Sequence, residues 1–229
     1  MAVVAVWSVK GGVGVSSVAA MLAIAQAERA EPTVLVDLCG DVPAVLGIED
    51  ADVENAAPGV AEWLGSQEPT ADALARIERP ARRDVSVLPR GAHSISRLGE
   101  TQDMTPLLTA LHASQRTVIV DCGLMHSTGE SPVGEVISGA AMSLLVVREC
   151  FLNLRAAQRA PFVPTGVIVL KEPGRQFRRA DVESATGAPV VAQIAVDARI
   201  AQSIDAGLAT ARLPRRLVRC LAGVLGNDR

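Results

Sequence analysis

The sequence predicts an α/β fold in three layers, with a doubly wound, mainly parallel sheet flanked by helices. Short apolar segments alternate along the chain with longer segments rich in Ala and Leu, which is the order that produces right-handed βαβ units. Hydrophobic residues make up 49% of the 229 residues and aromatic residues only 2%. The core must therefore be built from aliphatic side chains, as in parallel strands covered by Ala-rich helices.

The first half of the chain begins with a strand, a glycine-rich turn and a helix. Residues 2–7 (AVVAVW) are a short apolar run, and residues 15–29 follow with the Ala, Leu, Met and Ile of a mostly buried helix. Residues 33–37 (TVLVD) form a second apolar strand that ends in a carboxylate. Further along we expect short helices at 59–65 and 70–78, a strand at 84–88 and a helix at 104–113.

The second half repeats the same alternation. Residues 117–121 (TVIVD) again combine four strand-forming residues with a terminal Asp. Strands are expected at 142–147, 165–170 and 189–194, and helices at 153–160, 179–186, 197–206 and 215–225. No linker, repeat or low-complexity tract interrupts the pattern, so we expect residues 1–229 to form a single domain.

Composition and charge indicate which binding partners and which cellular compartment to expect. The net charge of −3 provides no global attraction to DNA, and the few aromatic residues provide no platform for stacked bases, so nucleic acid is not the favoured partner. The N-terminus reads as a strand and not as a signal peptide, and no apolar stretch reaches the ~18 residues of a membrane span. The four cysteines form no C-x-x-C pair, which indicates free thiols in a reducing cytoplasm.

A phosphate-binding layout without its lysine occupies residues 8–17 (SVKGGVGVSS). A loop of the G-x-x-x-x-G-K-[ST] type cradles phosphates with backbone amides, reaches the β/γ oxygens with a lysine and holds Mg²⁺ with a hydroxyl. Here Ser16 provides the hydroxyl, and Val15 stands where the lysine is needed. The flexible backbone comes from Gly11, Gly12 and Gly14.

Two carboxylates are expected beside this loop. Asp37 and Asp121 each end an apolar strand, and the loop follows the strand at residues 2–7. In open parallel sheets, ligands lie beyond the carboxyl ends of the strands. We therefore expect the loop and both carboxylates to meet at one edge of the sheet.

This constellation resembles the ParA/MinD family of P-loop ATPases, the deviant Walker A group of the SIMIBI class, over nearly the whole chain. The family's loop K-G-G-x-G-K-[ST] is matched by KGGVGVSS, and the segments 41–47 and 189–207 also look like those of the family. The resemblance implies a P-loop NTPase-like, Rossmann-like fold. Among its members, positioning proteins of the CpaE/TadZ and MinD types look most similar.

The resemblance also implies roles for individual residues. Lys10 matches the signature lysine that reaches a partner's nucleotide across a dimer interface, and Asp37 matches the first acidic residue of the switch segment; with Asp41, these are the candidate catalytic residues. Ser16 and Asp121 match the residues that hold Mg²⁺. The cofactor-binding candidates are Gly11, Gly12, Val13, Gly14, Val15, Ser16 and Ser17.

Three departures from the family weaken nucleotide chemistry. Val15 replaces the loop lysine, and Cys39 stands where many relatives carry a second acidic residue, for which Asp41 is a candidate substitute. The stretch VLKE after the predicted strand 165–170 lacks the Asn that reads adenine in relatives. Losing one charge-assisted contact to the transferring phosphoryl group removes about 3 kcal/mol, or more than about 100-fold in rate. We therefore expect ATP and Mg²⁺ to be bound weakly or not at all.

The function predicted from these features is intracellular positioning by a degenerate ParA/MinD-like protein, in cell division, DNA partition or the placement of pilus or secretion machinery. It would act by self-association as a homodimer or homopolymer, together with a protein partner of the system, and with weak or absent ATP hydrolysis. The first alternative is an active ATP-dependent dimerising switch.

The second alternative is a membrane-surface adaptor, peripheral to the cytoplasmic membrane. The run 212–225 has apolar residues at helical spacing, flanked by Arg212, Arg215, Arg216 and Arg219. The competing interpretation is a last helix that packs its apolar face on the sheet. Other arginines, Arg82 and Arg83, are expected in an exposed loop, and Arg175, Arg178 and Arg179 at a solvated loop and helix start.

Overall fold

A computed structural model describes residues 2–48, 58–82, 84–95, 99, 102–125, 130–206 and 213–226. Its strands are β1 (Val3–Ser8), β2 (Thr33–Asp37), β3 (Arg79–Arg82), β4 (Val85–Leu88), β5 (Thr117–Leu124), β6 (Met142–Arg148), β7 (Gly166–Lys171) and β8 (Val190–Ala195). They form one eight-stranded sheet in the order β3-β4-β2-β5-β1-β6-β7-β8. Every neighbouring pair is parallel except β3–β4, which confirms the predicted fold class.

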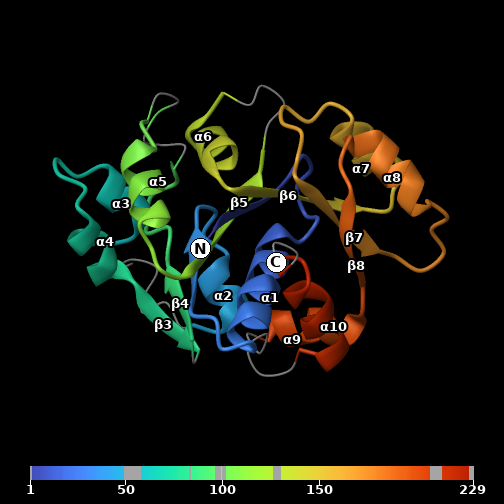
Figure 1. The fold of residues 1–229 in the computed structure, drawn as a ribbon, viewed down its shortest axis with the longest axis horizontal. Coiled ribbons are helices and arrows are strands. Elements are labelled where there is room, and N and C mark those ends of the chain that lie inside the picture. The colour runs from blue at the N-terminus through green and yellow to red at the C-terminus, as the bar shows by residue number, and fades with distance from the viewer. Residues whose placement is uncertain are drawn as a thin grey trace.

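The helices form a layer on each face of the sheet (Figure 1). One layer contains α1 (Val15–Ala27), α2 (Val42–Leu46), α9 (Ala198–Asp205) and α10 (Arg215–Ala222). The other contains α3 (Val60–Leu64), α4 (Ala71–Ile77), α5 (Thr105–His112), α6 (Pro132–Gly139), α7 (Phe151–Ala157) and α8 (Arg179–Thr186). Because helices cover both faces, every residue of β1 and β2 is buried, which is why these strands read as continuous apolar runs.

One strand and two helices of the described structure, β3, α2 and α6, were not predicted from the sequence. The edge strand β3 (RPAR) is polar and pairs antiparallel with β4, so it lacks the apolar run of a central strand. Arg82 belongs to this strand and not to a loop, and Arg83 lies outside the described residues. The helix α2 spans only five residues. The third missed element, α6, does carry a start signal, because Ser131 precedes Pro132 at the first helical position.

The start of α6 provides a stability prediction. The Ser131 hydroxyl accepts a hydrogen bond from the backbone amide of Gly134 at 3.1 Å. Ser131→Ala should lower the free energy of unfolding by about 1 kcal/mol, since an orphan amide of the first turn loses its partner. Urea denaturation measures the change. Ser138→Ala, at an exposed position near the end of the same helix, should change stability by much less; equal losses would contradict a capping role.

The last helix packs on the domain. Leu217, Leu221 and Ala222 of α10 are buried in the same aliphatic cluster as α1. The Arg29 guanidinium donates a hydrogen bond to the carbonyl oxygen of Ala222 at 3.3 Å, at the C-terminal end of α10. The apolar face that the membrane alternative requires is thus covered by protein, while Arg212 lies outside the described residues. Among the described helices, none is long and apolar enough to cross a bilayer.

Candidate functional site

The glycine-rich loop connects β1 to α1 at the carboxyl edge of the sheet (Figure 1). Gly12 and Gly14 have φ angles of 72° and 94°, a region that side chains disfavour. Gly14 is the residue that precedes the helix, so no side chain caps the first amides of α1. The exposed amides and the helix dipole make this end of α1 a favourable place for an anion.

A cavity of about 740 Å³ opens beside this loop. Of the residues around it, Asp41 is the only one with a charged side chain; no Lys or Arg of the described part of the chain lines it. The lining consists of Ser8, Gly11, Gly12, Val13, Gly14, Val15, Ser16, Ser17, Cys39, Asp41, Ala44, Val45, Gly123, Leu124 and Ile204. The structure therefore brings all seven cofactor-binding candidates to one cavity, together with Asp41.

Val15 and Lys10 explain why this cavity lacks positive charge. Val15 is only 7% exposed, and its side chain belongs to the aliphatic cluster between α1 and the sheet. Lys10 is exposed and lies outside the cavity lining. Its ammonium makes no hydrogen bond or ion pair with any residue that the structure describes. Val15 occupies the position of the loop lysine and carries no charge. In this conformation Lys10 does not supply the missing positive charge to the cavity.

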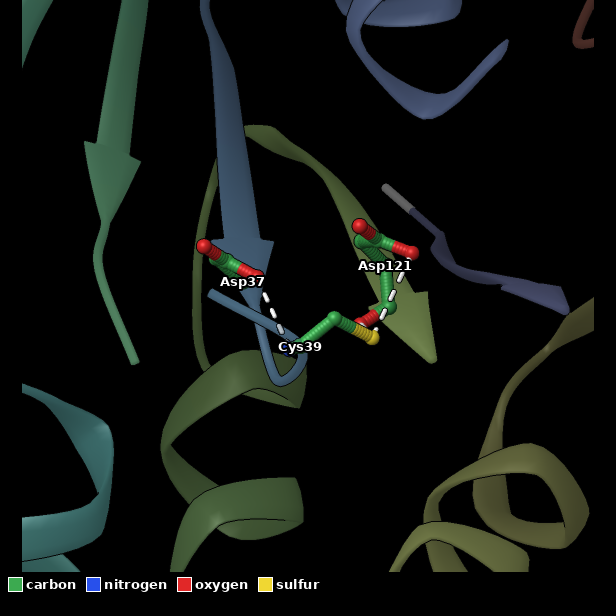
Figure 2. Close-up of side chains that lie close together, drawn as sticks. All are labelled: Asp37, Cys39 and Asp121. Carbon is green, nitrogen blue, oxygen red and sulfur yellow. Dashed lines mark hydrogen bonds between the residues drawn. The ribbon is translucent and has the colours of Figure 1, made fainter. Parts of the chain in front are cut away.

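Asp37 holds the turn that follows β2. Its Oδ1 accepts hydrogen bonds from the amides of Cys39 and Gly40 at 2.8 and 2.7 Å, and its Oδ2 accepts one from Val42 at 3.2 Å. Burial raises the pKa of this carboxyl, and the three amides act in the opposite direction. Figure 2 shows the hydrogen bond from the Cys39 amide to this carboxylate, which also has an oxygen within 4.8 Å of the Cys39 Sγ. Since Asp37 does not line the cavity, the structure places it in support of the turn.

Asp121 presents an oxygen that lacks a partner. Its Oδ1 accepts a hydrogen bond from the Gly123 amide at 3.1 Å, whereas its Oδ2 is buried without a hydrogen-bond partner among the described residues. Burial raises the pKa of Asp121 from its ordinary 3.8 to about 7. The nearby Ser16 hydroxyl acts to lower this pKa, although it does not form a hydrogen bond with Oδ2. A carboxylate oxygen beside a hydroxyl is a pair of hard oxygen ligands, so these residues fit Mg²⁺.

Cys39 joins the two carboxylates with a neutral group. Its Sγ lies 3.6 Å from the carbonyl oxygen of Asp121 and 3.8 Å from Oδ1 of the same residue, and Figure 2 shows the thiol directed toward Asp121. Burial, followed by the nearby Asp121 and Asp37 carboxylates, raises the pKa of the thiol. Cys39 therefore stays protonated at neutral pH and cannot accept a proton from water as a carboxylate could.

Two residues of this region were missed from the sequence. A Cβ on Gly123 would lie 2.3 Å from the Cys39 Sγ and would displace the thiol, and the φ of 59° at this position also favours glycine. The Arg90 guanidinium donates to the carbonyl oxygen of Cys39 and favours the charged form of Asp37. Gly123, two residues after the TVIVD segment, could have been recognised from the sequence. Nothing in the sequence indicated that Arg90 would contact this turn.

Ion pairs occupy the end of β7, in the stretch that lacks the Asn expected from the resemblance. Lys171 lies 3.5 Å from the buried Glu149, and Glu172 pairs with Arg148 at 3.1 Å and with Arg175 at 3.3 Å. Arg179 pairs with Glu183 at 2.8 Å, and the backbone of Arg178 takes part in the cap of α8. The arginine cluster thus lies at a loop and helix start, as expected, with Arg175 and Arg179 in local pairs.

The sheet order and the glycine-rich loop after β1 define a ParA/MinD-like P-loop protein. The family described as "Cellulose biosynthesis protein BcsQ" matches residues 1–121, more than half of the chain, and the chain belongs to this family. A search of curated proteins finds no match to this chain.

Solved structures support the same fold. The septum site-determining protein MinD of Pyrococcus horikoshii, complexed with Mg-ADP, is 16% identical with a TM-score of 0.72, over 97% of this chain and 93% of that one. The MinC:MinD cell division complex of Aquifex aeolicus gives 15% and 0.73, over 100% and 98%. A ParA family ATPase from Chlorobium tepidum gives 16% and 0.72, over 96% of each chain. At such identities the likeness establishes the fold, and it leaves the chemistry to the residues.

Proposed function

We propose that this chain is a degenerate positioning protein of the ParA/MinD type, which works by self-association and has weak or absent ATP hydrolysis. The system that it serves is cell division, partition or cellulose synthesis, as the names of its relatives suggest, or the placement of pilus or secretion machinery, as the sequence resemblance implies. The observation that carries the proposal is the cavity of about 740 Å³ at the glycine-rich loop, where Asp41 is the only charged lining residue described.

Electrostatics explains why this cavity would be poor at ATP turnover. Phosphoryl transfer depends on positive charge placed against the transferring group. The backbone amides of the loop and the N-terminus of α1 provide part of this charge. Ser16 and Asp121 would hold Mg²⁺, which would neutralise part of the phosphate charge. With Val15 in the lysine position, the remaining contact is lost, and Cys39 adds no carboxylate to order water.

Self-association should therefore not depend on ATP. Purified protein should show the same mass by size-exclusion chromatography with light scattering, with or without ATP and Mg²⁺, and calorimetry should detect weak or no ATP binding. Lys10→Ala should leave that mass unchanged, because the exposed ammonium would matter only with nucleotide at the interface. A monomer that dimerises on addition of ATP, and fails to do so after Lys10→Ala, would contradict the proposal.

That opposite outcome would support the active switch as the alternative function. One observation favours it: Lys10 is exposed, and its ammonium has no ion-pair partner among the described residues. The ammonium could therefore contact the nucleotide of a partner subunit without first breaking another pair. The unpartnered Oδ2 of Asp121 likewise remains available for a cation. Mass in solution with and without nucleotide separates the two functions.

A further inference from the structure

A second, basic cavity lies at the opposite end of α1 from the glycine-rich loop. Its volume is about 600 Å³, and it is formed by α1, β3, α10 and the residue Leu213. The residues around it are Ile24, Glu28, Arg82, Leu213, Arg215, Val218 and Arg219, none of which lines the first cavity. Ile24 follows Gly14 by ten residues, so the two cavities are separated by about 15 Å along the helix.

The lining of the basic cavity has an excess of positive charge. Three arginines and one glutamate give it a formal charge of +2. The glutamate, Glu28, already pairs with Arg82. Arg215 and Arg219 are exposed, and neither forms an ion pair within the described part of the chain. Among the residues that the structure describes, these two guanidinium groups therefore have no counter-charge.

The placement of these two arginines on α10 is unfavourable in the absence of an anion. Arg215 is the first residue of the helix and Arg219 lies one turn later on the same face, where like charges repel and destabilise a helix. The helix dipole adds to the repulsion at Arg215, since the N-terminal end is positive, and no acidic residue occupies the first turn. An anion between the two guanidinium groups would relieve both effects.

We propose that this cavity is a binding site for a phosphate group. Guanidinium groups bind phosphate oxygens through paired, charge-assisted hydrogen bonds, and a lining of charge +2 matches a phosphate dianion. Ile24, Leu213 and Val218 add an apolar wall that suits a ligand whose phosphate is attached to a nonpolar group. A soluble phosphate compound and a phospholipid headgroup share this chemistry.

The first test compares pyrophosphate binding to the full-length chain and to two double variants by calorimetry at low salt. Arg215→Gln with Arg219→Gln should weaken binding at least about tenfold, because two charge-assisted contacts are lost. The matched control is Arg155→Gln with Arg159→Gln, which removes two exposed arginines at the same spacing from the region of α7 and should leave binding unchanged. Circular dichroism and thermal unfolding confirm that each variant is folded.

A second arm identifies the source of the phosphate. Sedimentation with vesicles of phosphatidylcholine alone, or mixed with phosphatidylglycerol, tests the headgroup. Pyrophosphate binding that depends on Arg215 and Arg219, without vesicle binding, assigns a soluble ligand; vesicle binding that requires phosphatidylglycerol and the same arginines assigns a lipid. The proposal is overturned if neither probe binds, or if both double variants bind the probes as the unaltered protein does, which would place any phosphate at the glycine-rich loop instead.

Discussion

Replacing Val15 by lysine is expected to tighten the binding of ATP and Mg²⁺ at least about tenfold, or about 1.4 kcal/mol, and to raise turnover by a similar factor or more. Val15 lines the cavity while its side chain is packed among aliphatic neighbours. The methylene stem of a lysine can take the place of the valine, and its ammonium can extend into the cavity. Because no Lys or Arg of the described residues lines that cavity, the added ammonium would be the cationic side chain that contacts the phosphates. Calorimetry and phosphate release measure the two effects.

Val15→Met is the matched control for this substitution. Methionine is long and flexible like lysine but carries no charge, so it should leave ATP binding at the level of the unaltered chain. If Val15→Lys and Val15→Met bind ATP equally, the remaining parts of the cavity are not arranged for a nucleotide. In that event the loss of nucleotide chemistry has a cause other than the missing charge.

Replacing Asp121 by asparagine should stabilise the protein at pH 8 by on the order of 1–3 kcal/mol. The pKa of Asp121 is about 7 in the folded chain, above its ordinary value of 3.8, because burial disfavours the carboxylate. Between these two values the folded state holds the proton more strongly than the unfolded state. The contribution of Asp121 to the free energy of unfolding should therefore fall as the pH rises from about 4 through 7. Asparagine removes this decline and keeps an oxygen for the Gly123 amide.

Urea denaturation across pH 4–8 checks this expectation, with Asp41→Asn as the comparison. The Asp41 carboxylate at the same cavity contributes to the raised pKa of Asp121, so its removal should lessen the decline without abolishing it. Addition of Mg²⁺ should partly restore the stability of the unaltered protein at pH 8, since a cation stabilises the buried carboxylate. A pH profile that is the same before and after Asp121→Asn would show that this carboxyl is not the group that titrates.

Much of the site could be predicted because its parts are local in sequence. The glycines of the loop, Ser16 and the Asp residues at two strand ends are each tied to a strand boundary, and parallel strands bring their carboxyl ends together. The seven loop residues do line one cavity, with Asp41 beside them. The roles of Lys10 and Asp37 could not be predicted in this way, because both depend on where a side chain points after folding.

The amino-acid sequence by itself determined the α/β fold class, the phosphate-binding layout and the missing lysine, since these follow from residue type and periodicity along one stretch of chain. Only the tertiary structure decided how the parts are used. It buried the apolar face of α10 against α1, engaged Asp37 with three backbone amides, left Asp121 Oδ2 without a described partner, and gathered Arg82, Arg215 and Arg219 around a second cavity. The physical reason is that burial, pairing and charge balance depend on contacts between residues far apart in the chain, and such contacts exist only once the sheet has brought its helices together.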